Sequence, residues 1–526
     1  MKAIWVLLLA SVTGMAQNAN IPHLERRGAA TQFVVDGKPF LMLGAELHNS
    51  SSSSLEYMKP IWPRLKDIPL NTVLTPLSWE LVEPVEGKYD FALLDGLIQQ
   101  ARQNDLHVVF LWLASWKNGM SSYAPVWVKQ DTRRFPRVIA DGKQVEILST
   151  FGKATMEADA RAFAAVMRHI REVDQQQHTV LMMQVENEVG VLGDTRDHSA
   201  EAEKAFGSAV PTELTNYFET HREALNPELR ACWDEYGSKK SGTWEQVFGP
   251  TLRTDEIFMA WHFGQYVNTV AAAGKREYAL PMYTNTWLAG ESTPPGMYPS
   301  GGPQPRVIDI WKAAGSAIDI YSPDIYQPNF EQWSKRYHRA DNPLFIPEAR
   351  GDETGAANVF YAVGEHAALG FSPFGIDSWT DKENELGKSY GALMQLAPLI
   401  LEHQTKRETA GFVLNPANRA VSFVMRDYLV EVSLDSIFGS NAQSGFGVLV
   451  ATGENEFMGA GGGFRVKFQR RQGAGAVGIS YVEEGRYAKG RWVPGRRLNG
   501  DENDQGNYWR FAPQGVNVEK AVLYRW

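Results

Sequence analysis

The sequence predicts an α/β protein built from a (β/α)8 TIM barrel followed by a C-terminal all-β sandwich domain. Between about residues 30 and 405, short apolar runs alternate with amphipathic stretches, which is the pattern of a parallel sheet covered by helices. After about residue 405 the pattern changes to short strand-like runs separated by glycine, asparagine and aspartate. We therefore expect the barrel over residues 22–405 and the sandwich over residues 406–526.

The first residues resemble an export signal. Met1 and Lys2 precede an apolar run over residues 3–10, and Ala16 provides the small residue of a cleavage site. This predicts a signal peptide over residues 1–16 and an exported mature protein that is periplasmic or extracellular. A membrane-spanning helix needs about twenty apolar residues. Polar residues interrupt the run before that length, so no membrane span is expected after cleavage.

Eight apolar runs are predicted to form the barrel strands. They cover residues 40–45, 72–76, 107–113, 180–185, 281–284, 318–322, 344–347 and 370–376. Between the third and fourth runs, Phe163, Val166, Met167, Ile170 and Val173 recur at helical spacing, as expected for a helix that packs on the barrel. The interval between the fourth and fifth runs is too long for one helix and predicts an elaborated loop with extra helices above the barrel.

The sandwich is predicted from five short runs over residues 420–425, 429–434, 446–450, 464–468 and 477–482. The net charge is −9, and we find no basic run long enough to bind phosphates, so nucleic acid is not an expected partner. The single cysteine, Cys232, cannot form an internal disulfide. Stability must then come from burial, and the chain is long enough for two cores.

Two glutamates follow predicted barrel strands. Glu188 follows the fourth strand, and Glu348 follows the seventh, where Pro347 is expected to end the strand ladder. Barrel active sites form at the carboxyl ends of the strands, and paired carboxylates there suit acid/base and nucleophilic work on a glycosidic bond. Taken alone, Glu188 could be an ordinary loop carboxylate or a helix cap, but two such glutamates in one barrel favour a catalytic pair.

Neighbouring residues extend this hypothesis. Glu186 points the same way as Glu188 but deeper, so we expect a structural role. Asn187 is expected beside the sugar, where it could bond the 2-hydroxyl. Arg350 could pair with Glu348 and keep it ionised, or it could tie down a loop.

Three further motifs resemble one known family. They are VDGKPF over residues 35–40, Trp79 with Glu83 and its following proline, and QVENEVG over residues 184–190. These motifs resemble those of clan A glycoside hydrolases, and within the clan those of family 35, the β-galactosidases. The resemblance covers roughly residues 30–380. It implies that Glu188 is the acid/base and Glu348 the nucleophile of a retaining hydrolase.

The sequence also departs from that family. Residues 75–80 read TPLSWE where members resemble TYVPWN, so a tyrosine expected to contact the sugar is missing. Residues 114–119 read ASWKNG in place of a CAEW-type segment, and Val189 occupies an aromatic position. These changes affect positions that recognise galactose in that family. The spacing of the glutamates also suits family 42 and other members of the clan.

Four more residues are candidate substrate contacts. Tyr326 follows the sixth strand and could bond Glu348 or pack in the core. Trp379 follows the eighth strand, where clan members resemble a platform tryptophan under the sugar. Glu46 ends the first strand with His48, and the two could line the pocket floor or form a structural pair. Asn118 lies in the altered segment after the third strand.

The predicted function is a retaining, exo-acting β-galactosidase that removes terminal β-galactosyl residues from oligo- or polysaccharides, with xyloglucan side chains as a reasonable target. The alternatives are another clan A β-glycosidase, acting on glucose, mannose or arabinose, and a non-catalytic secreted carbohydrate-binding protein. Retention requires the two carboxyl groups to lie roughly 5–5.5 Å apart. No cofactor is needed and no metal site is expected, and the sequence does not indicate an oligomeric state.

Overall fold

The computed structural model describes residues 21–378, 384–436, 442–473 and 475–526. The expected signal peptide over residues 1–16 and Trp379 lie outside the described residues. The eight predicted runs form a closed parallel barrel in the order β10-β11-β12-β13-β4-β5-β6-β9. The strands are β4 (Met42–Glu46), β5 (Thr72–Ser78), β6 (His107–Lys117), β9 (Val180–Asn187), β10 (Met282–Trp287), β11 (Ile320–Ile325), β12 (Ile346–Ala349) and β13 (Gly370–Pro373).

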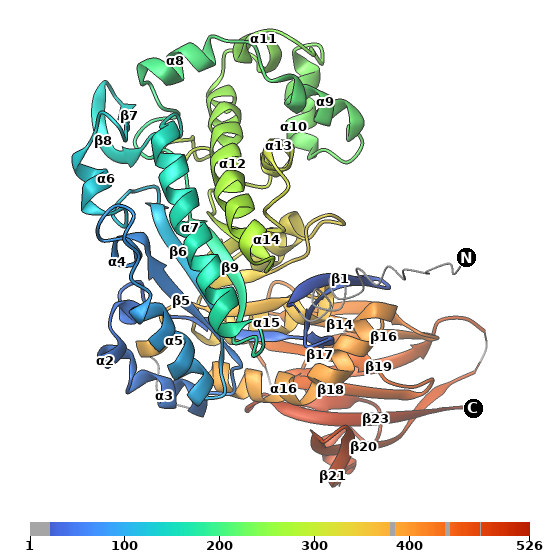
Figure 1. Ribbon diagram of the computed structural model, residues 1–526. Coiled ribbons are helices and arrows are strands. Elements are labelled where there is room, and N and C mark those ends of the chain that lie inside the picture. The colour runs from blue at the N-terminus through green and yellow to red at the C-terminus, as the bar shows by residue number, and fades with distance from the viewer. Residues whose placement is uncertain (1–20, 379–383, 437–441, 474) are drawn as a thin grey trace, which may run out of the picture.

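Helices surround this barrel because its parallel strands are apolar on both faces (Figure 1). Four residues of the predicted α7 stripe, Phe163, Val166, Met167 and Ile170, are buried, whereas the fifth, Val173, is exposed near the end of the helix. The covering helices and turns are α2 (Leu55–Met58), α3 (Ile61–Asp67), α4 (Trp79–Val82), α5 (Ala92–Gln103), α6 (Val126–Gln130), α7 (Lys153–Asp174), α13 (Ile308–Ala314), α14 (Phe330–Tyr337), α15 (Glu353–His366) and α16 (Glu385–His403), with a hairpin of β7 (Arg137–Ala140) and β8 (Lys143–Leu148).

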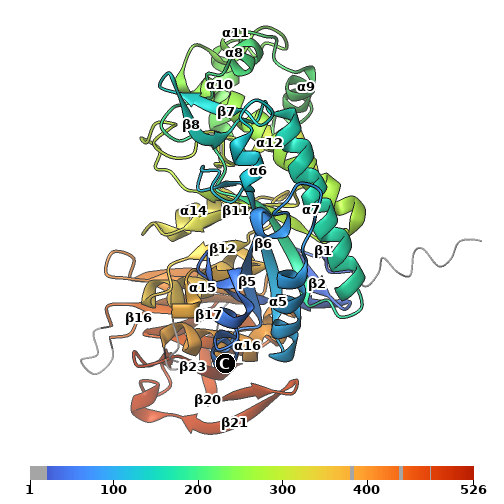
Figure 2. The same cartoon turned by 60° about the vertical axis from the view of Figure 1, so that its left-hand side comes forward.

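The long interval after β9 contains extra helices, as predicted. They are α8 (Ala200–Phe206), α9 (Thr212–Thr220), α10 (Pro227–Glu235) and α11 (Trp244–Phe248), followed by the long α12 (Leu252–Glu277). Both views show α8 to α11 at the end of the molecule opposite the sandwich (Figures 1 and 2). Cys232 on α10 is buried, and its Sγ lies 3.7 Å from the carbonyl oxygen of Phe248.

The C-terminal strands form two antiparallel sheets. The first contains β14 (Thr409–Leu414), β17 (Gly445–Ala451), β18 (Glu456–Gly462), β23 (Asn517–Arg525), β20 (Val477–Ala488) and β21 (Arg491–Leu498), and the second contains β15 (Ala420–Met425), β16 (Tyr428–Leu434), β19 (Phe464–Arg470) and β22 (Trp509–Phe511). Tyr428, Phe464 and Trp509 are buried between them. The first sheet also packs on the barrel, where Phe446 of β17 contacts Phe360 of α15 with ring centroids 5.5 Å apart.

A small three-stranded sheet covers the amino-terminal end of the barrel. It consists of β1 (His23–Arg27), β2 (Ala30–Val35) and β3 (Lys38–Phe40). The side chain of Phe33 is buried with Met42, Leu74 and Val109 in one apolar cluster inside the barrel. The prediction that the first barrel strand begins at Phe40 is wrong, because Phe40 pairs with Phe33 in this outer sheet instead.

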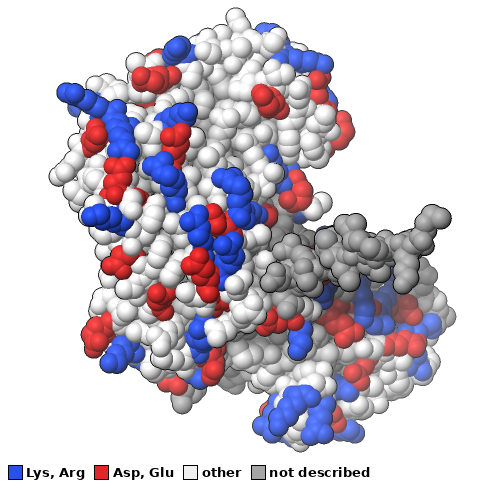
Figure 3. Space-filling model, viewed as in Figure 1, with Lys and Arg blue, Asp and Glu red and all other residues white. Residues whose placement is uncertain are grey.

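Charges are mixed over the surface. On the face shown in Figure 3, lysine and arginine side chains lie next to aspartate and glutamate side chains rather than forming a stripe of one sign. One such pair joins the long helices, where Arg168 of α7 lies 2.7 Å from Glu277 of α12. Among the described helices, none offers an apolar stretch of the length that a bilayer crossing requires.

Candidate active site

A pocket of about 420 Å³ opens at the carboxyl ends of the barrel strands. Three carboxyl groups and one amino group line it, each from a different strand or the residue after it: Lys117 of β6, Glu188 after β9, Asp324 of β11 and Glu348 of β12. The two glutamates singled out from the sequence therefore share one pocket.

The backbone at Glu188 is held in an uncommon conformation. Its φ angle is 44°, and that of Glu186 is 61°; both lie in the left-handed region that residues with a β-carbon rarely adopt. Such strain, about 1–3 kcal/mol, persists where the surroundings hold it. Here Asn285 Oδ1 accepts the N–H of Glu188 at 3.0 Å, and the carbonyl of Asn187 accepts the N–H of Asn118 at 3.2 Å.

Glu186 is fully buried and joins the ends of two strands. Its carboxyl oxygens accept the backbone N–H groups of Ser115 at 3.1 Å and Trp116 at 2.7 Å. Burial, followed by the neighbouring Asp159 carboxyl, raises the pKa of Glu186 well above its usual value. This contact fixes β6 against β9 directly before Lys117 and Glu188, which is the structural role expected of Glu186.

Asn285 on β10 connects the two catalytic candidates. Because Asn285 Oδ1 accepts the backbone N–H of Glu188, Asn285 Nδ2 points toward the carboxyl groups of Asp324 and Glu348. It donates to Asp324 Oδ2 at 2.8 Å and to Glu348 Oε1 at 3.3 Å. One amide thus orients the backbone of one glutamate and the side chain of the other.

Glu348 receives a second hydrogen bond from Tyr326, whose hydroxyl donates to Oε2 at 2.8 Å. Each Glu348 oxygen therefore has one donor, which stabilises a carboxylate and fixes its plane. Arg350 does not take part. Its guanidinium pairs with Asp352 on the exposed start of α15, so of the two roles considered for Arg350 the structure shows the loop contact and not the pairing with Glu348.

The seventh strand also runs further than predicted. Pro347 was expected to end the ladder, but β12 continues to Ala349, and Glu348 pairs with Asp324 of β11. The pairing of β12 with β13 is irregular between Ile346 and Ala349. This irregularity accommodates a proline that has no N–H to donate. As a result Glu348 lies within the strand rather than in a loop.

The pocket raises the pKa of two of its carboxyl groups. Burial, followed by the charge of Glu348, raises the pKa of Glu188 to about 7. Burial and the same charge raise the pKa of Asp324 well above its usual value. Both groups therefore hold a proton more readily than free carboxyl groups do, and Glu188 exchanges its proton near pH 7.

Lys117 supplies the positive charge among these carboxyl groups. Its burial opposes protonation, but the charges of Glu348, Glu188, Glu46 and Asp324 outweigh burial and raise its pKa. In turn its ammonium lowers the pKa of Glu188. Lys117 was not predicted as a site residue, because the third strand was expected to end at Leu113 whereas β6 continues to Lys117.

Several polar side chains near the pocket have no partner among the described residues. Both amide atoms of Asn187 and the Oδ1 atoms of Asn118 and Asn49 are buried without a hydrogen bond. Asn118 and Asn49 line the pocket directly. A buried amide atom without a hydrogen bond costs free energy. Sugar hydroxyls can both donate and accept hydrogen bonds, so these atoms are suited to bind a carbohydrate.

Glu46 is fully buried at the end of β4, and neither of its carboxyl oxygens has a partner among the described residues. Burial, followed by the charge of Glu348, raises its pKa well above its usual value. His48 does not pair with Glu46. Its Nδ1 instead lies 2.9 Å from Asp377 Oδ1.

One candidate residue and two further residues that were not predicted remain. Trp379 lies outside the described residues, so its predicted platform role stays a prediction. Asn285 and Asp324 were not predicted, although both lie near the carboxyl end of a barrel strand, which is the one signal that could have identified them. In the part of the chain that the structure describes, no cluster of histidine, cysteine and carboxylate side chains could hold a metal ion.

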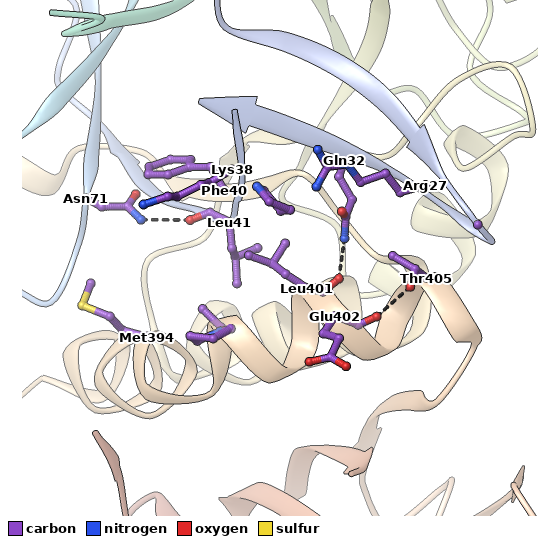
Figure 4. A pocket seen from close by; sticks show the side chains of 14 residues that line it. Arg27, Gln32, Lys38, Phe40, Leu41, Asn71, Met394, Leu401, Glu402 and Thr405 are labelled. Carbon is purple, nitrogen blue, oxygen red and sulfur yellow. Dashed lines mark hydrogen bonds between the residues drawn. The ribbon is translucent and has the colours of Figure 1, made fainter. Parts of the chain in front are cut away.

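A larger cavity of about 730 Å³ lies at the other end of the barrel (Figure 4). It is lined mainly by apolar side chains such as Leu41, Met394 and Leu401. Leu41 directly precedes β4, and Asn71 of the same cavity precedes β5, so the cavity lies at the amino ends of the strands. Barrel enzymes place their active sites at the opposite face, and the smaller pocket is therefore the catalytic candidate.

Comparison with known proteins points to the same chemistry. Residues 54–268 match the glycoside hydrolase family 42 model, which is described as beta-galactosidase. This part of the chain is therefore β-galactosidase-like. Residues 386–510 match a model described as a domain of unknown function.

Curated relatives are distant. A beta-galactosidase of Xanthomonas manihotis is 28% identical over 210 residues, covering 38% of this chain and 31% of that protein. Beta-galactosidase-1-like protein 3 of Homo sapiens is 27% identical over 183 residues, covering 33% of this chain and 25% of that protein. The chain thus spans about a third or less of the length of these relatives.

Solved structures resemble the chain weakly. A beta-galactosidase from the Antarctic haloarchaeon Halorubrum lacusprofundi aligns with a TM-score of 0.47 and 15% identity, over 68% of this chain and 58% of that one. The catalytic domain of beta-amylase from Paenibacillus polymyxa aligns with a TM-score of 0.45 and 12% identity, over 66% of this chain and 94% of that one.

Proposed function

We propose that the protein is a retaining, exo-acting β-galactosidase that removes terminal β-galactosyl residues from an oligo- or polysaccharide. The observation that carries the proposal is the sharing of one pocket by two glutamates in different environments. Glu188 has a pKa raised to about 7, whereas each oxygen of Glu348 accepts a hydrogen bond. An acid and a nucleophile are the two roles that a retaining hydrolase requires.

In the first step the Glu348 carboxylate attacks the anomeric carbon and forms a glycosyl ester. At the same time the protonated Glu188 donates its proton to the leaving oxygen, so that the bond to the rest of the saccharide breaks without expelling an alkoxide. Tyr326 and Asn285 hold Glu348 in place for this attack. Orientation of this kind supplies a large part of the rate in such reactions.

In the second step water hydrolyses the ester. Esterification removes the negative charge of Glu348, which had raised the pKa of Glu188. The pKa of Glu188 then falls, helped by the ammonium of Lys117, and the Glu188 carboxylate can accept a proton from the attacking water. Glu348 leaves as a carboxylate, and the enzyme returns to its starting state.

The galactose preference draws support from the family match over residues 54–268 and from the family 35 motifs in the sequence. One observation favours a second candidate, a β-glycosidase for another sugar of the clan. Lys117 and Asn118 line the pocket where family 35 members resemble a glutamate-containing segment. A panel of nitrophenyl glycosides of galactose, glucose, mannose and arabinose distinguishes the two candidates.

Export and a plant polysaccharide substrate also belong to the proposal. The apolar run over residues 3–10 supports secretion to a periplasm or to the medium. A secreted hydrolase can meet long polysaccharides, and xyloglucan with galactosyl side chains is a substrate of the required chemistry. Fractionation of cells that express the full chain tests the location.

The decisive test separates the two glutamates. Glu348→Gln should abolish turnover of every substrate, because no ester can form. Glu188→Ala should still release nitrophenol rapidly from an activated galactoside, which needs no acid, and then stall as the glycosyl-enzyme. Equal loss of both steps in the Glu188 variant would refute the assignment of roles.

A further inference from the structure

A second polar groove, of about 1070 Å³, lies between the barrel and the sandwich. Its barrel wall is formed by α14 along most of its length, from Asn329 to Arg336, and by the amino-terminal part of α15 from Glu353. In a (β/α)8 barrel the amino-terminal ends of the helices follow the carboxyl ends of the strands. The groove therefore reaches the side of the barrel on which the catalytic pocket opens.

The loop after β11 lines both cavities. Tyr326 and Gln327 line the catalytic pocket, and the next residue, Pro328, lines the groove. A chain whose terminal sugar occupies the pocket would reach the groove along this loop.

The lining of the groove suits a neutral saccharide. Two amide side chains line it, Asn358 on α15, which is partly buried, and Asn418 in the sandwich, which is exposed. Phe446 contributes an aromatic ring that is only partly buried. Amides and aromatic faces are the groups that contact sugar hydroxyls and the apolar faces of sugar rings.

The charges in the groove argue against an anionic ligand. Glu331, Glu353 and Glu385 line it, against two cationic residues. One of these cations, Arg336, already pairs with Glu228 at 2.9 Å. A phosphate or a uronate would therefore meet more negative charge than positive.

We propose that this groove binds the neutral oligosaccharide chain that carries the terminal sugar. The proposal rests on the proposed function and extends it from the reacting sugar to the rest of the substrate. It also gives a role to the sandwich, whose match is to a domain of unknown function, because Asn418 and Phe446 of the sandwich line the groove together with α15.

Two variants test the proposal, one on each wall. Alanine suits a helix interior, so Asn358→Ala should leave α15 intact, and Asn418 lies in an exposed turn. For a galactosylated xyloglucan oligosaccharide, each variant should lower kcat/KM by roughly three- to tenfold, the effect of one lost hydrogen bond. For 4-nitrophenyl β-galactoside, kcat/KM should not change. Asn507→Ala, an exposed asparagine of the sandwich away from the groove, is the matched control.

The proposal fails if both variants keep full activity on the oligosaccharide, or if they lose both activities equally. A binding measurement separates this failure from a failure of the proposed function. Calorimetric titration of Glu348→Gln with a xyloglucan oligosaccharide that lacks galactose should show binding that Asn418→Ala weakens, whatever the enzyme hydrolyses. A titration that shows no heat of binding would overturn the proposal that the groove binds saccharide. A groove that binds a protein partner instead would give this result.

Discussion

The Oδ1 atom of Asn285 accepts the backbone N–H of Glu188 at 3.0 Å, while the Nδ2 atom of the same side chain donates to Glu348 at 3.3 Å. The oxygen of an amide side chain accepts hydrogen bonds and its nitrogen donates them. One asparagine can therefore hold two catalytic candidates in one relative orientation. It also holds Glu188 in its left-handed conformation. The two proposed catalytic roles therefore depend on a residue that takes no part in bond making.

Asn285→Ala should lower kcat by about a hundredfold, because a misplacement of about 1 Å costs that much in rate. Steady-state kinetics on 4-nitrophenyl β-galactoside measures the loss. Asn285→Asp keeps an acceptor for Glu188 but adds a carboxylate beside Glu348, so it should be no better than the alanine variant. If Asn285→Ala changes KM alone, the side chain binds substrate and does not position the glutamates.

Tyr326→Phe should slow the formation of the glycosyl-enzyme by about ten- to a hundredfold. The substitution removes the hydroxyl that donates to Glu348 Oε2 at 2.8 Å and keeps the ring. A hydrogen bond to a charged group contributes about 1.5–3 kcal/mol. Pre-steady-state release of nitrophenol measures this step by itself. An unchanged burst rate would show that Asn285 alone is enough to hold the carboxylate.

The pH dependence of kcat/KM should have an alkaline limb near pH 7, where Glu188 loses the proton it must donate. Lys117→Met should move this limb to higher pH. The ammonium stabilises the Glu188 carboxylate, so its removal raises the pKa of Glu188 further. Lys117→Arg keeps the charge and should leave the limb in place. If the alkaline limb of kcat/KM lies at the same pH in the methionine and arginine variants, this electrostatic role of Lys117 is contradicted.

The sandwich should lose stability as pH rises. Burial raises the pKa of Glu519 to about 8 from an ordinary value of 4.5, so the folded state binds a proton that the unfolded state releases. This contribution is complete below about pH 4.5 and is lost as pH rises through about 8. Glu519→Gln keeps an acceptor for the Trp509 indole, which lies 2.8 Å away. The variant should be more stable than the wild type at pH 8.5 by on the order of 4 kcal/mol, with little difference at pH 5.

Denaturant unfolding at the two pH values checks this prediction. Glu456→Gln is a suitable control, because Glu456 on the neighbouring strand β18 is paired with Lys520 near the surface. A Glu519 variant that is equally stabilised at both pH values would indicate better packing rather than a change in proton binding.

The barrel strands could be predicted because buried parallel strands are continuous apolar runs. The prediction failed where the polarity of a strand changes along its length. β6 continues through Ser115 to Lys117, and these polar residues look like a loop in the sequence. The predicted start of the first barrel strand at Phe40 was wrong for the opposite reason. An apolar residue of an outer sheet cannot be distinguished in the sequence from an apolar residue of the barrel.

The site residues that lie at the ends of predicted strands could be predicted from the sequence. Glu188 and Glu348 end apolar runs, so their meeting in one pocket could be expected. The contacts of Asn285 depend on the register of β10 against β11, where it pairs with Ser322. They also depend on the left-handed turn at Glu188. Neither is encoded in a local pattern, so the residue that joins the glutamates could be found only from the structure.

The burial of Cys232 makes the protein convenient for spectroscopy. It is the only cysteine of the chain, it is buried on α10, and burial raises the pKa of its thiol. Maleimide reagents attack the thiolate of accessible cysteines, so the native thiol should stay unlabelled in the folded protein. A dye on a single introduced cysteine, for example at Ser444 on the groove wall, would then report saccharide binding without any background substitution.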